Sequence, residues 1–231
     1  MIHVTNLQKN YNGTTVLTIP ELSIAEGESV GLVGNNGAGK TTFFRLLLDL
    51  IEATSGEVTI NDEKIARRDN WKALVGSFLD ESFLIDFLTP EEFFKFTGNI
   101  YGKSAGDMQL FLDSMQEFFN GEIIGSGKLI RDLSKGNQKK VGIAAALIGD
   151  PRILILDEPF TALDPSSQIR LKRMLNELQA TKNTTMLISS HDLNHVTEVC
   201  RRTVVLEKGC VVKDIPTSVD TLKELERYFA V

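Results

Sequence analysis

The chain has 231 residues, of which 42% are hydrophobic and 24% are charged, and its formal net charge is −6. This composition excludes a disordered chain and predicts one compact domain over residues 1–231, while the negative charge gives no general electrostatic reason to bind nucleic acid. The first ten residues include polar residues where a signal peptide has its apolar core, and no run reaches the roughly 18 apolar residues of a membrane helix. We therefore expect a cytoplasmic protein without direct membrane insertion.

Three β-like runs open the sequence, at residues 2–7, 16–24 and 29–33, with turn residues between them. A glycine-rich turn follows the third run, and the apolar residues beyond it predict a buried helix over 41–51. Residues 56–65 predict a hairpin that returns to the early strands. The N-terminal part is therefore expected to contain an antiparallel β subdomain.

The middle of the chain, approximately residues 80–145, is rich in Phe and predicts an inserted α-helical subdomain. Thr89-Pro90-Glu91-Glu92 is typical of a helix start within it. Strands and helices then alternate, with a helix at 141–148, a strand at 153–156, a helix at 165–180, a strand at 185–189, a helix from Leu193 and a hairpin at 203–213. This alternation predicts an α/β fold with a mostly parallel sheet that helices cover on both faces.

Residues 34–41 fit the phosphate-loop pattern and lie between a predicted strand and a predicted helix. Glycines let successive N–H groups turn toward phosphate oxygens, and the helix start adds unpaired N–H donors and the positive end of its dipole. Lys40 would reach the β- and γ-phosphates, and the Thr41 hydroxyl would coordinate Mg²⁺. The sequence thus predicts a P-loop NTPase core that binds ATP or GTP through Gly34, Asn35, Asn36, Gly37, Ala38, Gly39, Lys40, Thr41 and Thr42.

The apolar run 153–156 leads directly into Asp157 and Glu158. Adjacent carboxylates at the end of a buried strand are costly unless a cation or a reacting proton compensates them. We expect Asp157 to hold Mg²⁺ and Glu158 to orient and deprotonate the water that attacks the γ-phosphate. The order of these elements predicts a hydrolase.

Four further segments make the chain resemble the ABC ATPases. Residues 133–138, Leu-Ser-Lys-Gly-Asn-Gln, resemble the family's LSGGQ signature, and residues 160–165 resemble its D-loop. His191 is similar in position to the family's switch histidine, and Tyr11 to the aromatic residue that stacks on adenine. The resemblance covers nearly the whole chain and implies that His191 contacts the γ-phosphate.

The resemblance also implies a partner for each site. Two ABC domains dimerise head to tail, so the ATP at the phosphate loop of one copy would be closed over by Ser134, Lys135, Gly136 and Asn137 of the other. A Ser hydroxyl, a glycine N–H and a helix start form an anion site, which agrees with this role. We expect a homodimer that sandwiches ATP.

Three positions depart from the family pattern. The Gln that ligates Mg²⁺ in the family falls on Asp80, whose carboxylate can still hold the metal but adds negative charge near the phosphates. Lys135 replaces the first of two glycines in the signature, and Asn137 replaces its Gln. A Lys at this place is commoner among small exporter-type subunits of the family, and its charge suits a site near the γ-phosphate.

Other residues are assigned to ordinary structural roles. Most Phe residues of the inserted subdomain are expected to be core, because Phe93, Phe96 and Ile100 recur at helical spacing, while a minority would line a groove for a short helix of a membrane subunit. These Phe residues include Phe83, Phe87, Phe93, Phe94 and Phe96. We expect His195 on a solvated helix face. Cys200 and Cys210 fit neither a zinc site nor a redox pair, and predict two free, partly buried thiols.

The leading functional hypothesis is a Mg²⁺-dependent ATPase subunit that powers transport, in the export direction, through separate transmembrane permease subunits at the inner face of the cell membrane. Two alternatives stay open. One is a soluble ABC ATPase outside transport, and the other is a regulatory module that holds ATP without hydrolysing it.

Overall fold

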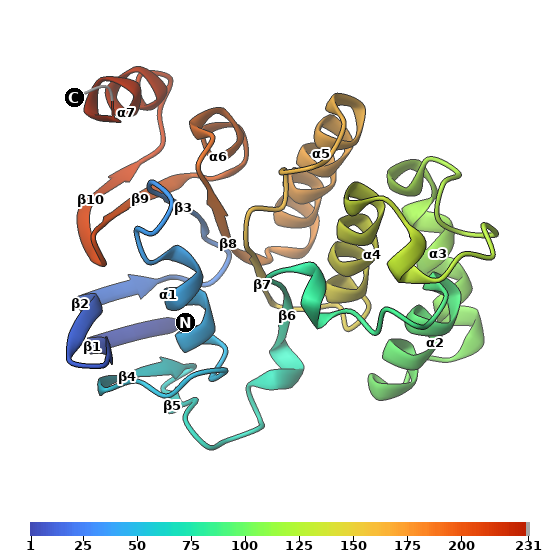
Figure 1. Ribbon diagram of the computed structural model, residues 1–231, viewed down its shortest axis with the longest axis horizontal. Coiled ribbons are helices and arrows are strands. Elements are labelled where there is room, and N and C mark those ends of the chain that lie inside the picture. Colours follow the sequence, from blue (N-terminus) through green and yellow to red (C-terminus); the bar gives the residue numbers. More distant parts are fainter. Residues whose placement is uncertain (230–231) are drawn as a thin grey trace.

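A computed structural model describes residues 1–229 of the chain, and its centre is a ten-stranded sheet in the order β5-β4-β1-β2-β10-β9-β3-β8-β7-β6 (Figure 1). The strands are β1 (Ile2–Tyr11), β2 (Thr14–Ile24), β3 (Ser29–Val33), β4 (Ser55–Ile60), β5 (Glu63–Lys64), β6 (Val75–Phe78), β7 (Ile153–Leu156), β8 (Thr185–Ser190), β9 (Arg202–Glu207) and β10 (Cys210–Pro216). The helices are α1 (Lys40–Leu47), α2 (Pro90–Ile100), α3 (Ala105–Phe119), α4 (Lys135–Leu147), α5 (Pro165–Lys182), α6 (Leu193–Val199) and α7 (Thr221–Phe229).

The sheet has an antiparallel and a parallel part, as the sequence predicts. Strands β1, β2, β4 and β5 pair antiparallel, whereas β9, β3, β8, β7 and β6 are parallel neighbours. The hairpin of β9 and β10 joins the two parts, because β10 pairs with β2 at Cys210 and Thr18. The predicted α/β fold with a mostly parallel sheet is confirmed.

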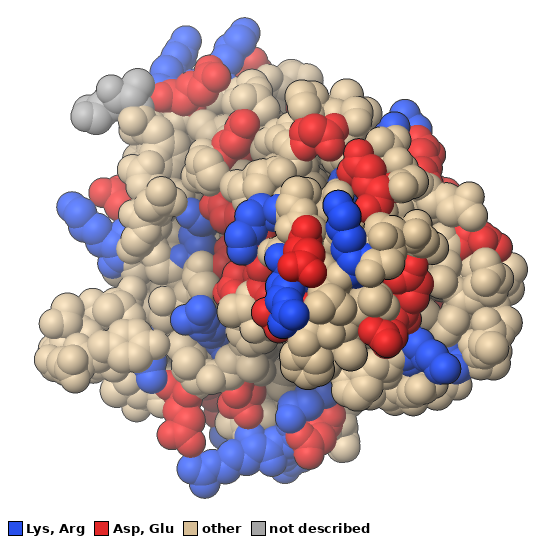
Figure 2. All heavy atoms as spheres, turned by 45° about the vertical axis from the view of Figure 1, so that its right-hand side comes forward, with Lys and Arg blue, Asp and Glu red and all other residues tan. Residues whose placement is uncertain are grey.

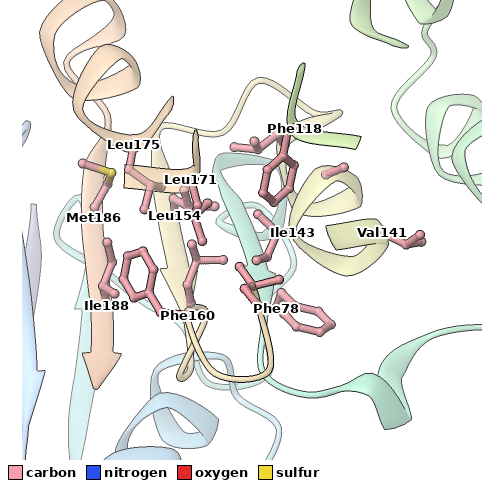
Figure 3. Packing of buried hydrophobic residues seen from close by; sticks show 14 of the residues in the cluster. Phe78, Phe118, Val141, Ile143, Leu154, Phe160, Leu171, Leu175, Met186 and Ile188 are labelled. Carbon is pink, nitrogen blue, oxygen red and sulfur yellow. The ribbon is translucent and has the colours of Figure 1, made fainter. Parts of the chain in front are cut away.

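Alternating side chains of the central strands fill two separate cores. Ile153 and Ile155 of β7 pack on one face of the sheet with α1 and the antiparallel strands. Leu154 and Leu156 pack on the other face with α4, α5 and α6 (Figure 3). Helices therefore cover both faces, and this is why residues 153–156 form an uninterrupted apolar run.

Helix α4 lies against β6 at the position of Gly142. A Cβ atom added to Gly142 would lie 2.0 Å from Cε2 of Phe78, so only glycine permits this close approach. Figure 3 shows Phe78 between β6 and α4 in the core. This contact lets the second half of α4 pack closely on β6.

Helices α2 and α3 lie at the side of the molecule away from the antiparallel strands (Figure 1). Thr89 and Glu92 form a capping box at the start of α2, as predicted, and Ser104 and Asp107 form another at the start of α3, a helix that the sequence did not predict. Phe94 is fully buried and stacks on Phe119 with ring centres 5.6 Å apart.

The predicted core role of Phe96 and Ile100 is wrong. Phe96 is 47% and Ile100 is 66% exposed, because the buried face of α2 follows the row Pro90, Phe94 and Gly98, with Phe93 beside it. Phe83 and Phe87 are also exposed.

The predicted solvated position of His195 is wrong. Its side chain is 12% exposed, and its ring centre lies 4.5 Å from that of Phe160. Burial lowers the pKa of His195 below its ordinary value. The short helix α6 turns this residue toward the loop after β7, whereas Asn194 and Glu198 take the solvated side.

The two thiols differ from one another. Cys200 is buried, and burial raises its pKa to about 12, whereas Cys210 is exposed. On the face shown in Figure 2, acidic and basic side chains lie interspersed between uncharged areas. Within residues 1–229, no helix combines the length and the apolar character that crossing a membrane requires.

The first testable prediction concerns the contact between α4 and β6. We expect Gly142→Ala to lower the free energy of unfolding by about 1–3 kcal/mol, because Phe78 must move to admit the methyl group. Gly106→Ala on the exposed first turn of α3 is the control and should change stability by less than about 0.5 kcal/mol. Urea unfolding followed by circular dichroism measures both values, and equal values would contradict the packing argument.

Candidate functional site

The phosphate loop connects β3 to α1 and depends on its glycines. Gly37 and Gly39 have φ angles of +82° and +105°, in the left-handed region that glycine adopts without strain. A Cβ atom on Gly34 would lie 2.3 Å from the carbonyl oxygen of Leu206. The loop therefore packs directly on β9 and brings its backbone to the start of α1.

The final hairpin holds the loop from the other side. The N–H of Gly209 donates to the carbonyl oxygen of Ala38 at 2.9 Å. Gly209 also permits a close approach to β2, since a Cβ atom there would lie 2.2 Å from the carbonyl oxygen of Val16. The shape of the loop is thus set by residues far from it in the sequence.

A cleft of about 320 Å³ opens over this loop. Its lining consists of Tyr11, Val16, residues 36–42 and Glu158. Tyr11 ends β1 with 46% of its surface exposed, and Nζ of Lys9 lies 4.8 Å from the centre of its ring. The structure thus brings the predicted adenine-stacking residue, the phosphate loop and the predicted general base to one cleft.

The carboxylate of Asp157 lies against the start of α1. The Thr41 hydroxyl donates to one carboxylate oxygen of Asp157 at 2.5 Å, and the Ser189 hydroxyl donates to the other. Asp157 is buried, so these two bonds replace the water that its charge has lost. Two oxygen groups suited to Mg²⁺ therefore stand next to each other beside the phosphate loop.

Glu158 follows Asp157 in the left-handed region, with φ of +47°. Such a backbone costs about 1–2 kcal/mol for a residue with a Cβ atom, so its surroundings must hold it in place. Its N–H donates to the Ser189 hydroxyl at 2.8 Å. One carboxylate oxygen lies 3.4 Å from Nζ of Lys40, and the other lies 2.8 Å from Nδ1 of His191.

Lys40 is itself directed into the loop, where its Nζ donates to the carbonyl oxygen of Gly34 at 2.6 Å. His191 lies beyond the end of β8 and is exposed on its far side. It also donates its backbone N–H to the Glu158 carboxylate at 3.3 Å. The two residues therefore hold the carboxylate of Glu158 between a buried ammonium group and an imidazole.

The signature residues stand at the start of α4. The Ser134 hydroxyl caps this helix by accepting the N–H of Asn137 at 3.2 Å, and Lys135 extends its ammonium group to within 3.4 Å of Oε1 of Gln138. A Cβ atom on Gly136 would lie 2.6 Å from the carbonyl oxygen of Ala162, so the signature packs against the D-loop. In the described part of the chain, residues 134–137 lie outside the cleft.

Asp80 lies at the end of β6 and caps the short turn Glu81–Phe83. Its carboxylate accepts the N–H of Ser82 at 2.8 Å, and Nη2 of Arg45 in α1 lies 3.9 Å away. The geometry thus places Asp80 beside α1 with a cation as its neighbour. Its role as a metal ligand stays a prediction.

Sequence reasoning missed two residues that complete the site. Ser189 joins Asp157 to the backbone of Glu158, and Lys139 of α4 donates to the Glu158 carbonyl oxygen at 2.8 Å. The polar residues that end the apolar strand β8 were a signal for Ser189. Lys139 carries no such signal, because a Lys on a predicted helix is ordinarily solvated.

Residues 17–161, well over half of the chain, match the family described as ABC transporter. The chain belongs to the ABC transporter family. Among its ABC relatives, the bacitracin transport ATP-binding protein BcrA of Bacillus licheniformis is 31% identical, over 99% of this chain and 73% of BcrA. The Nod factor export ATP-binding protein I of Bradyrhizobium diazoefficiens is 31% identical, over 92% of this chain and 69% of that protein. The chain spans 55% of the length of one uncharacterized ABC transporter ATP-binding protein of Synechocystis.

Solved ABC proteins share the fold. The structure of an ATP-binding subunit of an ABC transporter matches at 29% identity with a TM-score of 0.84, over 99% of this chain and 93% of that chain. A dimeric ATP-binding cassette in a post-hydrolysis state with ADP and Pi matches with a TM-score of 0.82, over 94% of this chain and 99% of the other. At 24% identity, this second likeness shows the fold.

The bonds of Ser189 generate the second prediction. Ser189→Ala leaves the buried N–H of Glu158 without its acceptor and removes a donor from Asp157, so we expect the free energy of unfolding to fall by about 1–3 kcal/mol. The neighbouring Ser190→Ala removes only the acceptor for the N–H of Asp192 and should cost less. Urea unfolding compares the two variants, and a larger cost for Ser190→Ala would refute the role of Ser189.

Proposed function

We propose that this ABC protein binds and hydrolyses Mg²⁺-ATP, and that hydrolysis powers transport through separate membrane-spanning subunits. The observation that carries the proposal is the position of Glu158, whose carboxylate is held by Lys40 and His191 at the mouth of the phosphate loop. Membership of the family and the printed names of its relatives, which describe ATP-binding proteins, support the same activity.

The residues beside the loop suit a magnesium ion. The Thr41 hydroxyl and the Asp157 carboxylate are hard oxygen donors in direct contact with each other. They would hold Mg²⁺, and the bound ion would neutralise negative charge on the phosphates. Asp80 is the third proposed ligand, and its carboxylate caps the turn that follows it in this structure.

The protein groups divide the work of hydrolysis among them. Loop N–H groups and Lys40 bind phosphate oxygens, and Tyr11 offers an exposed ring to the adenine. Glu158 orients a water molecule and accepts its proton. His191 fixes the direction of that carboxylate through its ring and its N–H, and its exposed side is left to contact the γ-phosphate.

A second copy of the chain completes each site in this proposal. Ser134 and Lys135 are exposed at the start of α4, with Gly136 and Asn137 behind them, and they present a hydroxyl, N–H groups and a positive charge to an anion. The related cassette solved with ADP and Pi is a dimer, which supports this arrangement. ATP would then lie between the loop of one copy and the signature of its partner.

The membrane partner is proposed to contact a groove between the segment that follows α1 and the loop after β6. This groove of about 300 Å³ is lined by apolar side chains that include Leu50, Trp71, Leu79, Phe83 and Tyr101. Phe83 is 50% exposed, and an apolar helix of a permease would cover it. The chain would thereby lie at the inner face of the cell membrane, and the names of the bacitracin and Nod factor relatives, together with Lys135, favour export.

The central prediction is that Glu158→Gln slows ATP hydrolysis at least about 10²-fold, because the general base is lost. ATP affinity should be retained, and a dimer should accumulate with Mg²⁺-ATP. Phosphate release and size-exclusion chromatography measure these effects. Glu117→Gln, whose carboxylate pairs with Arg173 on the surface, is the matched control and should behave as the wild type. Unchanged turnover in Glu158→Gln would refute the assignment.

The groove gives a separate prediction about the partner. Phe83→Asp should abolish co-purification with the permease subunits and leave the ATP dissociation constant within about twofold, because Phe83 lies outside the nucleotide cleft. Leu110→Asp, at an even more exposed apolar residue of α3, should retain the permease. Retention by Phe83→Asp would place the contact elsewhere.

A further inference from the structure

Lys139 is a buried cation that the proposed reaction does not use. It lies on α4, and 6% of it is exposed. Its Nζ donates to the carbonyl oxygen of Glu158 at 2.8 Å and to the Thr161 hydroxyl at 2.6 Å. The Thr161 hydroxyl in turn donates to the same carbonyl oxygen at 2.8 Å. Lys139 thus joins α4 to the turn that follows β7.

Burial of this ammonium group costs free energy, and nearby carboxylates offset part of that cost. Desolvation lowers the pKa of Lys139, while the carboxylates of Glu81, Glu158, Asp157 and Asp80 oppose that shift. The Glu81 carboxylate lies 3.9 Å from its Nζ. An apolar residue would avoid this desolvation, so the lysine is better explained by what it holds than by packing.

Lys139 holds the backbone of Glu158. The N–H of this residue is fixed by Ser189 of β8, and its carbonyl oxygen is fixed by Lys139 of α4. Because the backbone there is left-handed, a turn without these two anchors would relax to a commoner conformation and redirect the carboxylate. With its backbone held by these two bonds, Glu158 directs its carboxylate toward Lys40 and His191.

We propose that Lys139 is a positioning residue for Glu158 and that it transmits the placement of the signature helix to the general base of the same chain. The proposal rests on the function proposed above. Lys139 lies one helical turn after Lys135, which would contact the nucleotide bound by the partner copy. When the signature of this chain closes over the ATP bound by the partner copy, Lys139 would therefore change the placement of Glu158, which acts on the ATP bound by this chain.

The experiment compares steady-state hydrolysis by wild type, Lys139→Met, Lys139→Gln and Lys140→Met. Lys140 is an equally buried lysine on the next position of α4, but it pairs with Glu122 at 3.4 Å and does not contact Glu158. The same change at the two lysines thus separates the effect on Glu158 from the general cost of altering a buried lysine. Urea unfolding and ATP binding by calorimetry are measured for each variant.

We expect Lys139→Met to lower kcat at least about tenfold with KM and the ATP dissociation constant within about twofold, because Lys139 lies outside the cleft and acts on orientation. Lys139→Gln keeps an N–H donor and should recover part of that loss. Lys140→Met should keep kcat within about twofold even where its stability falls.

Three results would overturn the proposal: kcat of Lys139→Met close to the wild-type value, a raised KM with unchanged kcat, or an equal loss of kcat in Lys140→Met. If Lys139→Met does not fold, Lys139→Gln and Thr161→Val test the proposal in its place, because each weakens the hydrogen bonds that join Lys139, Thr161 and the Glu158 carbonyl oxygen. A lowered kcat at constant KM in both supports the proposal, and wild-type kcat in either overturns it. Absence of hydrolysis by the wild type would instead refute the proposed function, so the two failures are distinguishable.

Discussion

Two adjacent carboxylates at the end of a buried strand are the constraint on which the structure of this ABC protein depends. Asp157 and Glu158 leave β7 among apolar side chains, where an uncompensated charge costs several kcal/mol. Three separate parts of the chain contact these carboxylates: the phosphate loop with α1, the end of β8, and the segment around His191. Lys139 of α4 bonds to the backbone carbonyl oxygen of Glu158 beside them. The sheet order places β3, β8 and β7 side by side, so these groups can meet at one edge. The fold can therefore be understood as the scaffold that brings the compensating groups to that edge.

Local patterns made the phosphate loop and the sheet predictable. Gly37 and Gly39 occupy backbone conformations that glycine adopts freely, so the sequence pattern and the geometry have the same cause. The apolar run of β7 reports burial on both faces, and Thr89 with Glu92 reports a helix start through hydrogen bonds only three residues apart. Each of these signals lies within a few residues of the feature that it predicts.

Features that depend on distant packing could not be predicted in this way. Phe93, Phe96 and Ile100 have helical spacing, but the face of α2 that is buried is decided by α3, whose Phe119 receives Phe94. The side chain of His195 becomes largely buried because Phe160, 35 positions earlier, packs against it. The role of Lys139 depends on contacts with residues 158 and 161, which no spacing along α4 encodes. The parts of the site that a single segment of the chain determines could thus be predicted from the sequence. The parts that depend on contacts between several segments could not.

The bond between Gly209 and Ala38 has a consequence for biogenesis. The backbone of the phosphate loop is braced by a hairpin that leaves the ribosome some 170 residues after the loop. A nascent chain therefore has no finished nucleotide pocket until that hairpin has been made, since domains fold as units once their distant contacts exist.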